Sequence, residues 1–273
     1  MKTIFFDTHT HYNHPDFDAD LSEVKGRIRK AGVKYDAVIG YDPDSSRKAI
    51  ELAAEDGSHF AVAGIHPLHA EPDIEEAMRK LESLASGNVA AIGETGLDYF
   101  KDRPRQVPDK ALQRELFRAQ LRLSKKLELP VVIHSRDAAQ DTAEILKDEG
   151  TGGPGGVIHC FSYSPEMAEI FTRMGFYLGI GGKVTYPASK RLRETVRRIP
   201  LEMLVLETDA PYLSPEGRRG ERNDSLSLPL IAEAVAEIKD ISPEEVARVT
   251  TENAFRLYRI HNYSHTPESR ERI

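Results

Sequence analysis

The feature that most constrains the fold is a regular alternation of strand and helix signals along nearly the whole chain. Short runs rich in Val, Ile and Phe predict strands at residues 3–7, 35–39, 60–65, 89–92, 130–133, 156–158, 176–180 and 203–206. Amphipathic segments of helical period lie between or after them, at 20–31, 44–55, 74–86, 109–127, 138–149, 165–174, 188–198, 228–239 and 243–259.

This pattern predicts a single (β/α)₈ TIM barrel over residues 1–260. One strand and one helix recur roughly every 30 residues, and barrels of this type are typically about 250 residues long. An open doubly wound sheet also alternates strands and helices, but eight units in 273 residues favour closure. Residues 261–273 are polar and aperiodic, so we expect a C-terminal tail there.

Composition narrows the classes of partner. With 37 Lys and Arg against 44 Asp and Glu, the net charge is −7. Such a chain has no global attraction to nucleic acid, so any anionic substrate must be held by local cations. No apolar stretch approaches the roughly 20 residues of a membrane helix, which predicts no membrane partner. The single cysteine, Cys160, excludes an internal disulfide and favours the cytoplasm. Nothing in the sequence indicates an obligate protein partner.

Polar side chains of metal-ligand type follow several predicted strands. The first strand runs into Asp7-Thr8-His9-Thr10-His11, where strict alternation would place Asp7, His9 and His11 on one face. Other strands are followed at once by Glu94, His134, His159 and Asp209. Because the carboxyl ends of barrel strands form the active-site face, these side chains are expected to meet at one mouth. We therefore predict a metal site.

The number of ligands indicates two divalent ions. Four imidazoles and two carboxylates exceed the three protein ligands plus water usual for one catalytic zinc. Glu94 has two carboxylate oxygens and could bridge two ions. Two metals roughly 3.5–4 Å apart suit hydrolysis of a phosphate ester. The mixed donor set fits Zn, Mn, Fe or Co better than Mg, and Asp209 is the candidate general base.

Neighbouring residues have open interpretations. Asp7 either shares the metal face or orients a ligand, and Asp98 either reaches the rim or is an exposed loop acid. His66 either contacts substrate or is a hydrogen-bonded structural residue. We expect Cys160 to pack away from the mouth, because alternation turns it from the face of His159.

Cations near the mouth could hold phosphate oxygens through their planar forks. Arg136 is two residues after His134, so the two would share a face of an extended strand. The last strand is followed by Arg218, Arg219 and Arg222. A solvated charged loop is the alternative, preferred for Arg218 and Arg219. Four aromatic residues also follow strands and either stack on bases or pack at the rim, namely Tyr99, Phe100, Tyr163 and Tyr212.

Seven collinear motifs resemble the TatD family of metal-dependent deoxyribonucleases. They are Asp7-Thr8-His9-Thr10-His11, Gly64-Ile65-His66-Pro67, Gly93-Glu94-Thr95-Gly96-Leu97-Asp98-Tyr99, Ile133-His134-Ser135-Arg136-Asp137-Ala138, His159-Cys160-Phe161-Ser162, Glu207-Thr208-Asp209-Ala210-Pro211-Tyr212 and Thr250-Thr251-Glu252-Asn253-Ala254. The resemblance implies a TIM-barrel hydrolase with two metals. It assigns His9, His11, Glu94 and Asp209 to one ion, and Glu94, His134 and His159 to the other.

The resemblance also implies an activity: nuclease action on DNA, often from the 3′ end, supported by Mg or Mn. Substrate binding would then involve His66, Arg136, Arg222 and Asn223. The family usually has Arg-Asn-Glu-Pro after the last strand, whereas this chain has Arg222-Asn223-Asp224-Ser225. The alternative is an amidohydrolase or lactonase that acts on a small molecule at the same two metals. A metal-dependent scaffold would need blocked coordination positions, which nothing in the sequence indicates.

Overall fold

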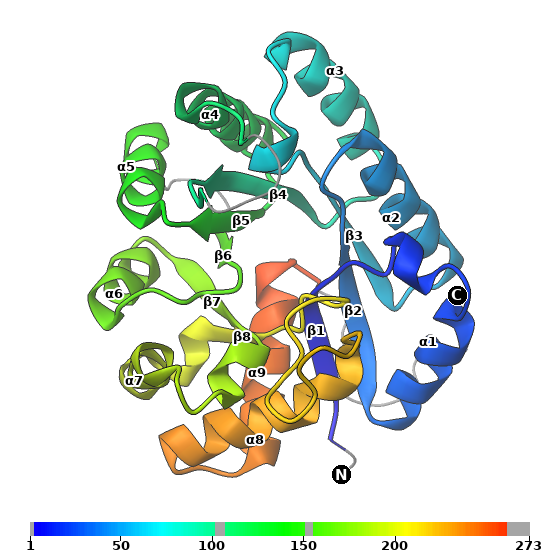
Figure 1. Ribbon diagram of the computed structural model, residues 1–273. Helices are drawn as coiled ribbons and strands as arrows, with labels where there is room; N and C mark the ends of the chain where they lie inside the picture. The colour runs from blue at the N-terminus through cyan, green and yellow to red at the C-terminus, as the bar shows by residue number, and fades with distance from the viewer. Residues whose placement is uncertain (1–2, 102–106, 151–154, 261–273) are drawn as a thin grey trace.

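Eight parallel strands form a closed ring with helices around it (Figure 1). The computed structural model describes residues 3–101, 107–150 and 155–260. Each strand pairs with the next along the chain, from β1 to β8. The ring closes where Thr10 bridges Ala210 and the His11 N–H donates to the Ala210 carbonyl at 2.8 Å. This sequential order and closure confirm the TIM barrel and exclude the open doubly wound sheet.

The elements follow the predicted alternation. The strands are β1 (Phe5–Thr10), β2 (Val33–Ile39), β3 (His59–Ala63), β4 (Ala91–Asp98), β5 (Val131–Arg136), β6 (Gly156–Ile158), β7 (Phe176–Ile180) and β8 (Leu204–Leu206). The helices are α1 (Leu21–Lys30), α2 (Pro43–Glu55), α3 (Ile74–Ala85), α4 (Lys110–Lys126), α5 (Ala139–Glu149), α6 (Pro165–Arg173), α7 (Lys190–Arg198), α8 (Leu228–Lys239) and α9 (Pro243–Leu257). Short 3₁₀ helices include η1 (Pro15–Phe17), η2 (Pro67–His69), η3 (Gly182–Thr185), η4 (Leu201–Met203) and η5 (Ser225–Ser227).

The last helix closes one end of the barrel. In Figure 1, α9 lies near the centre, beside β1 and β8. Phe6 stacks on Tyr258 and meets Phe255 edge to face, with ring centroids 5.7 and 5.4 Å away. The Tyr258 hydroxyl donates to the Thr8 carbonyl at 2.6 Å. These buried aromatic contacts fill the amino-terminal end of the ring, so the opposite, carboxyl end is the one available to a ligand.

Two β-bulges interrupt the ring near the carboxyl ends of its strands. In β1, Asp7 pairs with Asp36 and Thr10 with Val38, so three steps of β1 match two of β2. A similar shift falls between Ile92 and Thr95 of β4. Bulges redirect side chains and are common beside active sites. The bulge in β1 breaks the alternation on which the shared face of Asp7, His9 and His11 was predicted.

Asp7 is therefore corrected from a candidate on the metal face to a residue that braces the neighbouring strand. Its carboxylate accepts hydrogen bonds from the N–H and hydroxyl of Thr208, at 3.0 and 2.7 Å, and from the Ser225 hydroxyl at 2.6 Å. It also accepts the His9 N–H at 3.3 Å. Asp7 thus ties the end of β1 to the segment that carries Asp209.

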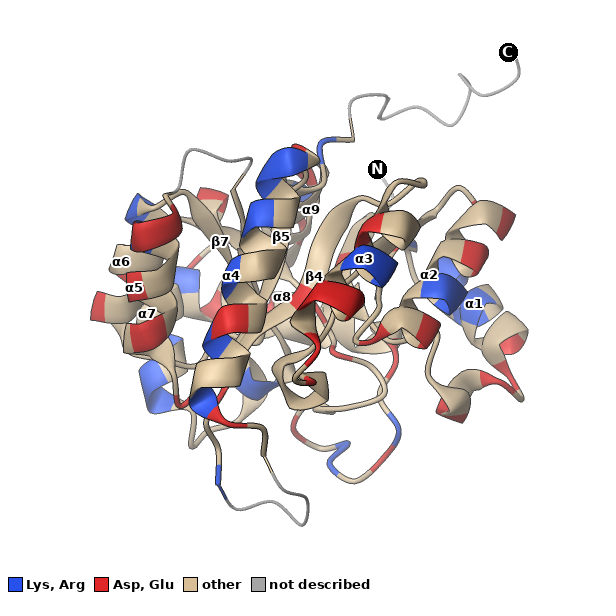
Figure 2. Cartoon of the chain, turned by 90° about the horizontal axis from the view of Figure 1, so that it is seen from above, with Lys and Arg blue, Asp and Glu red and all other residues tan. Residues whose placement is uncertain are grey.

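No helix in the described ranges has the length and apolar character needed to cross a bilayer. Acidic and basic residues are interspersed along the labelled outer helices in Figure 2. The predicted tail at 261–273 lies outside the described residues.

Candidate metal centre

Four ligand atoms from three strand ends converge at the mouth. His9 lies in β1 and His11 directly follows it, Glu94 lies in β4, and Asp209 follows β8. His9 Nε2 lies 3.3 Å from His11 Nε2, 3.5 Å from Glu94 Oε2 and 3.6 Å from Asp209 Oδ1. His11 Nε2 lies 3.8 and 3.4 Å from the same two oxygens. Ligands about 2.1 Å from a tetrahedral ion are about 3.4 Å apart, so this spacing fits one metal ion.

A second group uses the other oxygen of Glu94. Glu94 Oε1 lies 2.9 Å from His134 Nδ1 and 2.8 Å from His159 Nε2, and the two nitrogens are 3.1 Å apart. Ligands at right angles, about 2.1 Å from an ion, are about 3.0 Å apart. These three atoms would occupy one face of an ion's coordination sphere and leave other positions open. Glu94 therefore faces both groups.

Hydrogen bonds select the imidazole nitrogens that face the centre. His11 Nδ1 lies 3.0 Å from the Ile39 carbonyl, and His134 Nε2 lies 2.9 Å from Asp98 Oδ2. Because both partners accept, each of these nitrogens carries the proton. His11 Nε2 and His134 Nδ1 then present lone pairs toward the other ligands, the arrangement of metal-binding histidines. Asp98, fully buried, is thus neither a rim residue nor an exposed loop acid.

Close packing of the imidazoles also favours a bound cation. The His9 ring stacks on His159 at 4.0 Å, and His134 lies 5.3 Å from His159. One imidazolium proton could satisfy one of the short contacts. Protonation of all four rings would place several like charges together in a buried site. Divalent ions satisfy every lone pair at once, so the donor set fits them.

Both carboxylates of the centre are held ionised. Burial opposes the charge of Glu94, but His159, His66 and close contacts with the rings of His134 and His159 keep its pKa well below the usual range. Burial likewise opposes the charge of Asp209, but close contact with His11 and with the other nearby imidazoles lowers its pKa. Asp209 has a backbone φ of +58°, a left-handed conformation that Asp tolerates better than most residues. Asp209 is therefore available as a negatively charged ligand or base.

His66 lies beside the second group of ligands as a hydrogen-bond donor. Its Nδ1 accepts the Leu68 N–H at 3.2 Å, so Nε2 carries the proton of the neutral ring. That nitrogen is 3.6 Å from Glu94 Oε1, and the ring meets His134 edge to face at 4.4 Å. Burial lowers the pKa of His66 to about 3. The predicted substrate contact is thus compatible with the geometry through a neutral N–H.

Arg136 lies at the rim, at the end of β5. Its guanidinium stacks over the Phe100 ring, with the central carbon 3.8 Å from the ring centroid, and its side chain is exposed. The aromatic face orients the cation while leaving its N–H groups open to solvent. Arg136 is therefore open to an anionic ligand at the mouth, and its role in substrate binding stays a prediction.

Arg222 and Asn223 are not brought to the ligand cluster. The Arg222 guanidinium binds both oxygens of Asp20, at 2.9 and 2.5 Å, and lies over Phe17. The buried Asn223 amide donates to the carbonyls of Thr208 and Tyr212 at 2.9 and 2.7 Å. Existing bonds thus occupy both side chains that were expected to contact substrate. Their observed contacts fix the loop after β8.

The departure in this loop has a structural explanation. Asp224 caps η5, because its Oδ1 accepts the Leu226 N–H at 3.0 Å. Ser225, at the position where the resemblance expects proline, donates its N–H to the Tyr12 hydroxyl at 3.1 Å and its own hydroxyl to Asp7 at 2.6 Å. Proline has no N–H and no hydroxyl, so it could make neither bond. The two altered residues fasten the loop rather than disturb the ligand cluster.

Sequence reasoning missed Glu207. Its Oε1 accepts the Cys160 N–H at 2.5 Å and lies 3.7 Å from His159 Nδ1. Gly179 of β7 leaves the space, since a Cβ there would lie 2.1 Å from Glu207 Oε2. The sequence signal that could have found Glu207 is strand alternation. Glu207 is two residues before Asp209, and residues two apart share a face in an extended strand. Glu207 supports the strand end that presents His159.

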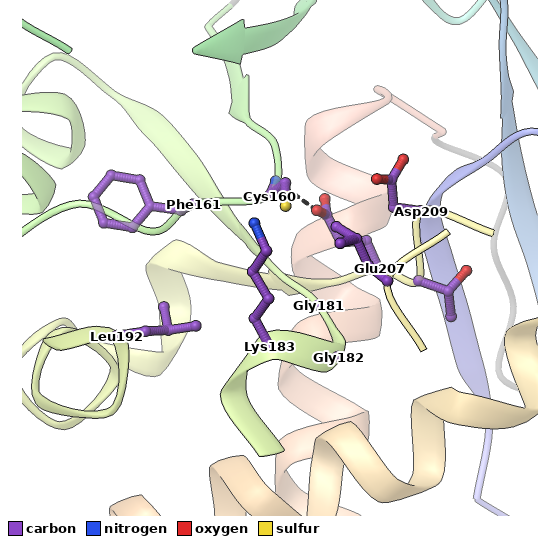
Figure 3. A pocket seen from close by; sticks show the side chains of 10 residues that line it. Cys160, Phe161, Gly181, Gly182, Lys183, Leu192, Glu207 and Asp209 are labelled. Atoms are coloured by element: carbon purple, nitrogen blue, oxygen red, sulfur yellow. Dashed lines mark hydrogen bonds between the residues drawn. The ribbon is translucent and has the colours of Figure 1, made fainter. Parts of the chain in front are cut away.

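The expectation for Cys160 is corrected. Strand β6 ends at Ile158, so alternation does not extend to Cys160, whose backbone has a φ of +46°. Its side chain lines a pocket at the mouth with Lys183 and Asp209 (Figure 3). Lys183, which follows β7, is a second residue that the sequence patterns did not single out.

A TIM barrel whose mouth gathers four imidazoles and two carboxylates is typical of metal-dependent hydrolases. The profile of the family described as TatD related DNase matches residues 6–259. The uncharacterized metal-dependent hydrolase YabD of Bacillus subtilis is 42% identical over 258 residues, covering 94% of this chain and 100% of YabD. YcfH of Escherichia coli K12, described in the same words, is 34% identical over 259 residues, covering 93% and 95%.

A solved structure agrees with the family match and with the two sequence relatives. The crystal structure of YjjV, a TatD homologue from Escherichia coli K12, superposes with a TM-score of 0.88 at 31% identity, covering 96% of this chain and 100% of YjjV. The chain belongs to the TatD family of metal-dependent hydrolases.

Proposed function

We propose that the protein is a deoxyribonuclease that hydrolyses DNA phosphodiester bonds with two divalent ions, removing nucleotides from the 3′ end. The observation that carries this proposal is the position of Glu94, whose two oxygens face two separate groups of imidazole ligands. Two ions held by these two groups would suit displacement at phosphorus, where charge develops on both the attacking and the leaving oxygen.

The proposed roles follow from the geometry. Bound at His9, His11, Glu94, His134, His159 and Asp209, the two ions would supply Lewis acidity and neutralise charge on the phosphate. Asp209, ionised at the open edge of the cluster, accepts the proton of the attacking water. The neutral N–H of His66 donates to a phosphate oxygen, and Arg136 binds a neighbouring phosphate at the rim.

Aromatic rings beside the cluster support a nucleic-acid substrate. Tyr212 is 48% exposed, and its ring meets His11 and His14 edge to face at 6.1 and 5.8 Å. The Phe100 ring lies under Arg136 at another part of the rim. Exposed aromatic faces next to cations are the usual means of holding single-stranded bases without regard to sequence.

The test is hydrolysis of end-labelled single-stranded DNA by metal-stripped protein. Mg, Mn, Zn and Co are added back separately, beside a panel of small lactones and amides. Asp209→Asn and Glu94→Ala serve as controls for contaminating nuclease. We expect stepwise shortening from the 3′ end with at least one ion, and its loss in both variants.

Two results would count against the proposal. Full activity in Glu94→Ala would exclude the two-metal mechanism, because that change removes a ligand from both groups. Turnover of a lactone or amide, without DNA cleavage under any ion, would mean that the protein is a hydrolase whose substrate is a small molecule and not DNA.

A further inference from the structure

Lys183 lies in a pocket next to the metal cluster. The pocket is lined by Cys160, Glu207, Asp209 and the two glycines that precede Lys183, among other residues. Figure 3 shows the lysine side chain rising from η3, with its nitrogen toward Cys160 and Glu207 and the carboxylate of Asp209 beyond them. Lys183 is thus the basic residue of this pocket, on the side of the centre where Asp209 enters.

Glycines fix the lysine in this place. A Cβ on Gly182 would lie 2.4 Å from the Leu213 carbonyl oxygen, so a larger residue would push η3 away from the loop after β8. With glycine at this position, η3 packs against the loop that follows Asp209. The close approach sets where the backbone of Lys183 lies relative to the cluster.

The ammonium group has no counter-ion in the part of the chain that the structure describes. Among residues 3–101, 107–150 and 155–260, no carboxylate lies within 4.0 Å of the Lys183 nitrogen and no hydrogen bond to it is found. Two other cations near the last strand are paired with acids, Arg222 with Asp20 and Arg218 with Glu221. A half-buried cation without a partner lacks part of its hydration and gains from an anionic ligand.

The charge of Lys183 acts on the pocket wall. Figure 3 shows the Lys183 nitrogen directed toward Cys160, which lines the same pocket. Cys160 directly follows the ligand His159, so the positive charge of Lys183 lies near the second ligand group. A ligand atom over that group would feel the same positive field.

Two open cations flank the strand that carries His159. Arg136 ends β5 and Lys183 follows β7, and β6 lies between those strands in the ring. The outer helices in Figure 2 carry interspersed charge of both signs, so attraction of an anion depends on such local cations. A chain of phosphates is the ligand that suits two cations on either side of a metal cluster.

We propose that Lys183 binds a nonbridging oxygen of the substrate phosphate beside Asp209, and thereby favours phosphate esters over uncharged esters and amides. This inference rests on the proposed phosphodiester hydrolysis and names a binding residue for it. A lysine ammonium is a compact charge with three rotatable donors, which suits a phosphate oxygen whose position shifts during reaction.

The test compares Lys183→Met and Lys183→Arg with wild type and with Lys147→Met. Methionine keeps the apolar stem and removes the charge. Lys147 is exposed on α5 near its carboxyl end, away from the mouth, so Lys147→Met is the matched control. Each protein is loaded with the ion that supports wild-type activity, its metal content is measured, and kcat and KM are determined on a single-stranded oligonucleotide.

For Lys183→Met we expect KM to rise roughly 10- to 100-fold, the effect of losing one charge-assisted hydrogen bond. Metal content and kcat should stay within about threefold of wild type, and Lys183→Arg should retain most of the affinity. The slope of log KM against log salt should become shallower by roughly 0.7, the value for one phosphate contact on a single strand. Lys147→Met should match wild type in every respect.

Unchanged KM and salt slope in Lys183→Met would overturn the inference while the proposed function stood. A fall in kcat with unchanged KM would also overturn it, since Lys183 would then act on Asp209 and not on substrate. Binding of inorganic phosphate to the metal-loaded proteins, measured by calorimetry, separates the two proposals. If wild type cleaves no DNA, at least tenfold weaker phosphate binding in Lys183→Met still supports the lysine as a phosphate ligand, and equal binding rejects it.

Discussion

Asp98 accepts a hydrogen bond from His134, with Asp98 Oδ2 and His134 Nε2 2.9 Å apart. This contact decides which imidazole nitrogen faces Glu94. Because a carboxylate only accepts, the proton of His134 stays on Nε2 and the lone pair of Nδ1 points into the second ligand group. Asp98 is therefore a positioning residue for the part of the centre formed by His134, His159 and Glu94.

Replacing Asp98 with Ala should weaken the second ion selectively. Outer partners of metal-binding histidines typically contribute 10- to 100-fold to metal affinity or activity, so a loss in that range is expected. The measurement is metal content per chain at graded chelator concentrations, together with kcat. Asp148→Ala removes an acid that pairs with Arg118 on the helical surface and should leave both quantities unchanged. A variant that keeps two ions at the wild-type chelator midpoint would contradict the assigned role.

Metal removal should lower thermal stability. Each ion that binds only the folded chain at about 100 times its dissociation constant adds about 2.7 kcal/mol to the free energy of unfolding. For a chain of this size that corresponds to a rise in Tm of roughly 5–10 °C per ion. Calorimetric scans of stripped and reloaded protein measure it, and Glu94→Ala should show a much smaller rise. Equal Tm values for stripped and reloaded wild type, with metal bound, would show that the ligand cluster does not couple to folding.

Stability at acid pH should depend on Asp42. A hydrogen bond with His69, 3.5 Å away, and the N–H of Ser45 lower the pKa of Asp42 to about 2, although burial opposes them. A depressed pKa in the folded state adds stability above the unfolded value of 3.8, which is lost as the pH falls toward about 2. Allowing for the partial exposure of this side chain, the contribution is about 1 kcal/mol.

The matched variant for this prediction is Asp42→Asn, because Asp42 is the N-cap of α2 and asparagine also caps a helix. Urea unfolding at pH 5 and pH 3 should show a smaller loss of stability in the variant than in wild type. Parallel curves for the two proteins would mean that Asp42 titrates with an ordinary pKa in the folded chain.

The fold and most of the ligand cluster could be predicted from the sequence for one physical reason. Parallel barrel strands are buried on both faces and read as short apolar runs, so the first polar residue after each run marks the mouth. Glu94, His134 and His159 were found in this way, and the structure brings them within 3.1 Å of one another.

What the sequence could not supply depends on contacts between distant segments. The bulge in β1 appears only in its register with β2, so alternation misplaced Asp7. Arg222 meets Asp20, a partner 202 positions away, and no local pattern reveals that this cation is already neutralised. Lys183 owes its position to the close approach of Gly182 and Leu213, which likewise joins two loops.

The bond between Ser225 and Asp7 supplies the last prediction, a test of how the altered loop supports the barrel. Burial raises the pKa of Asp7 to about 8, and the hydroxyls of Ser225 and Thr208 oppose this shift by donating to the carboxylate. Ser225→Ala removes one buried donor, so we expect the free energy of unfolding to fall by about 1–3 kcal/mol. Urea unfolding at neutral pH measures the change, with Ser22→Ala on the exposed face of α1 as the control. Because Asp7 also holds Thr208, next to Asp209, kcat should fall more than KM changes. Wild-type stability in Ser225→Ala would mean that the hydroxyl of Thr208 alone suffices to hold Asp7.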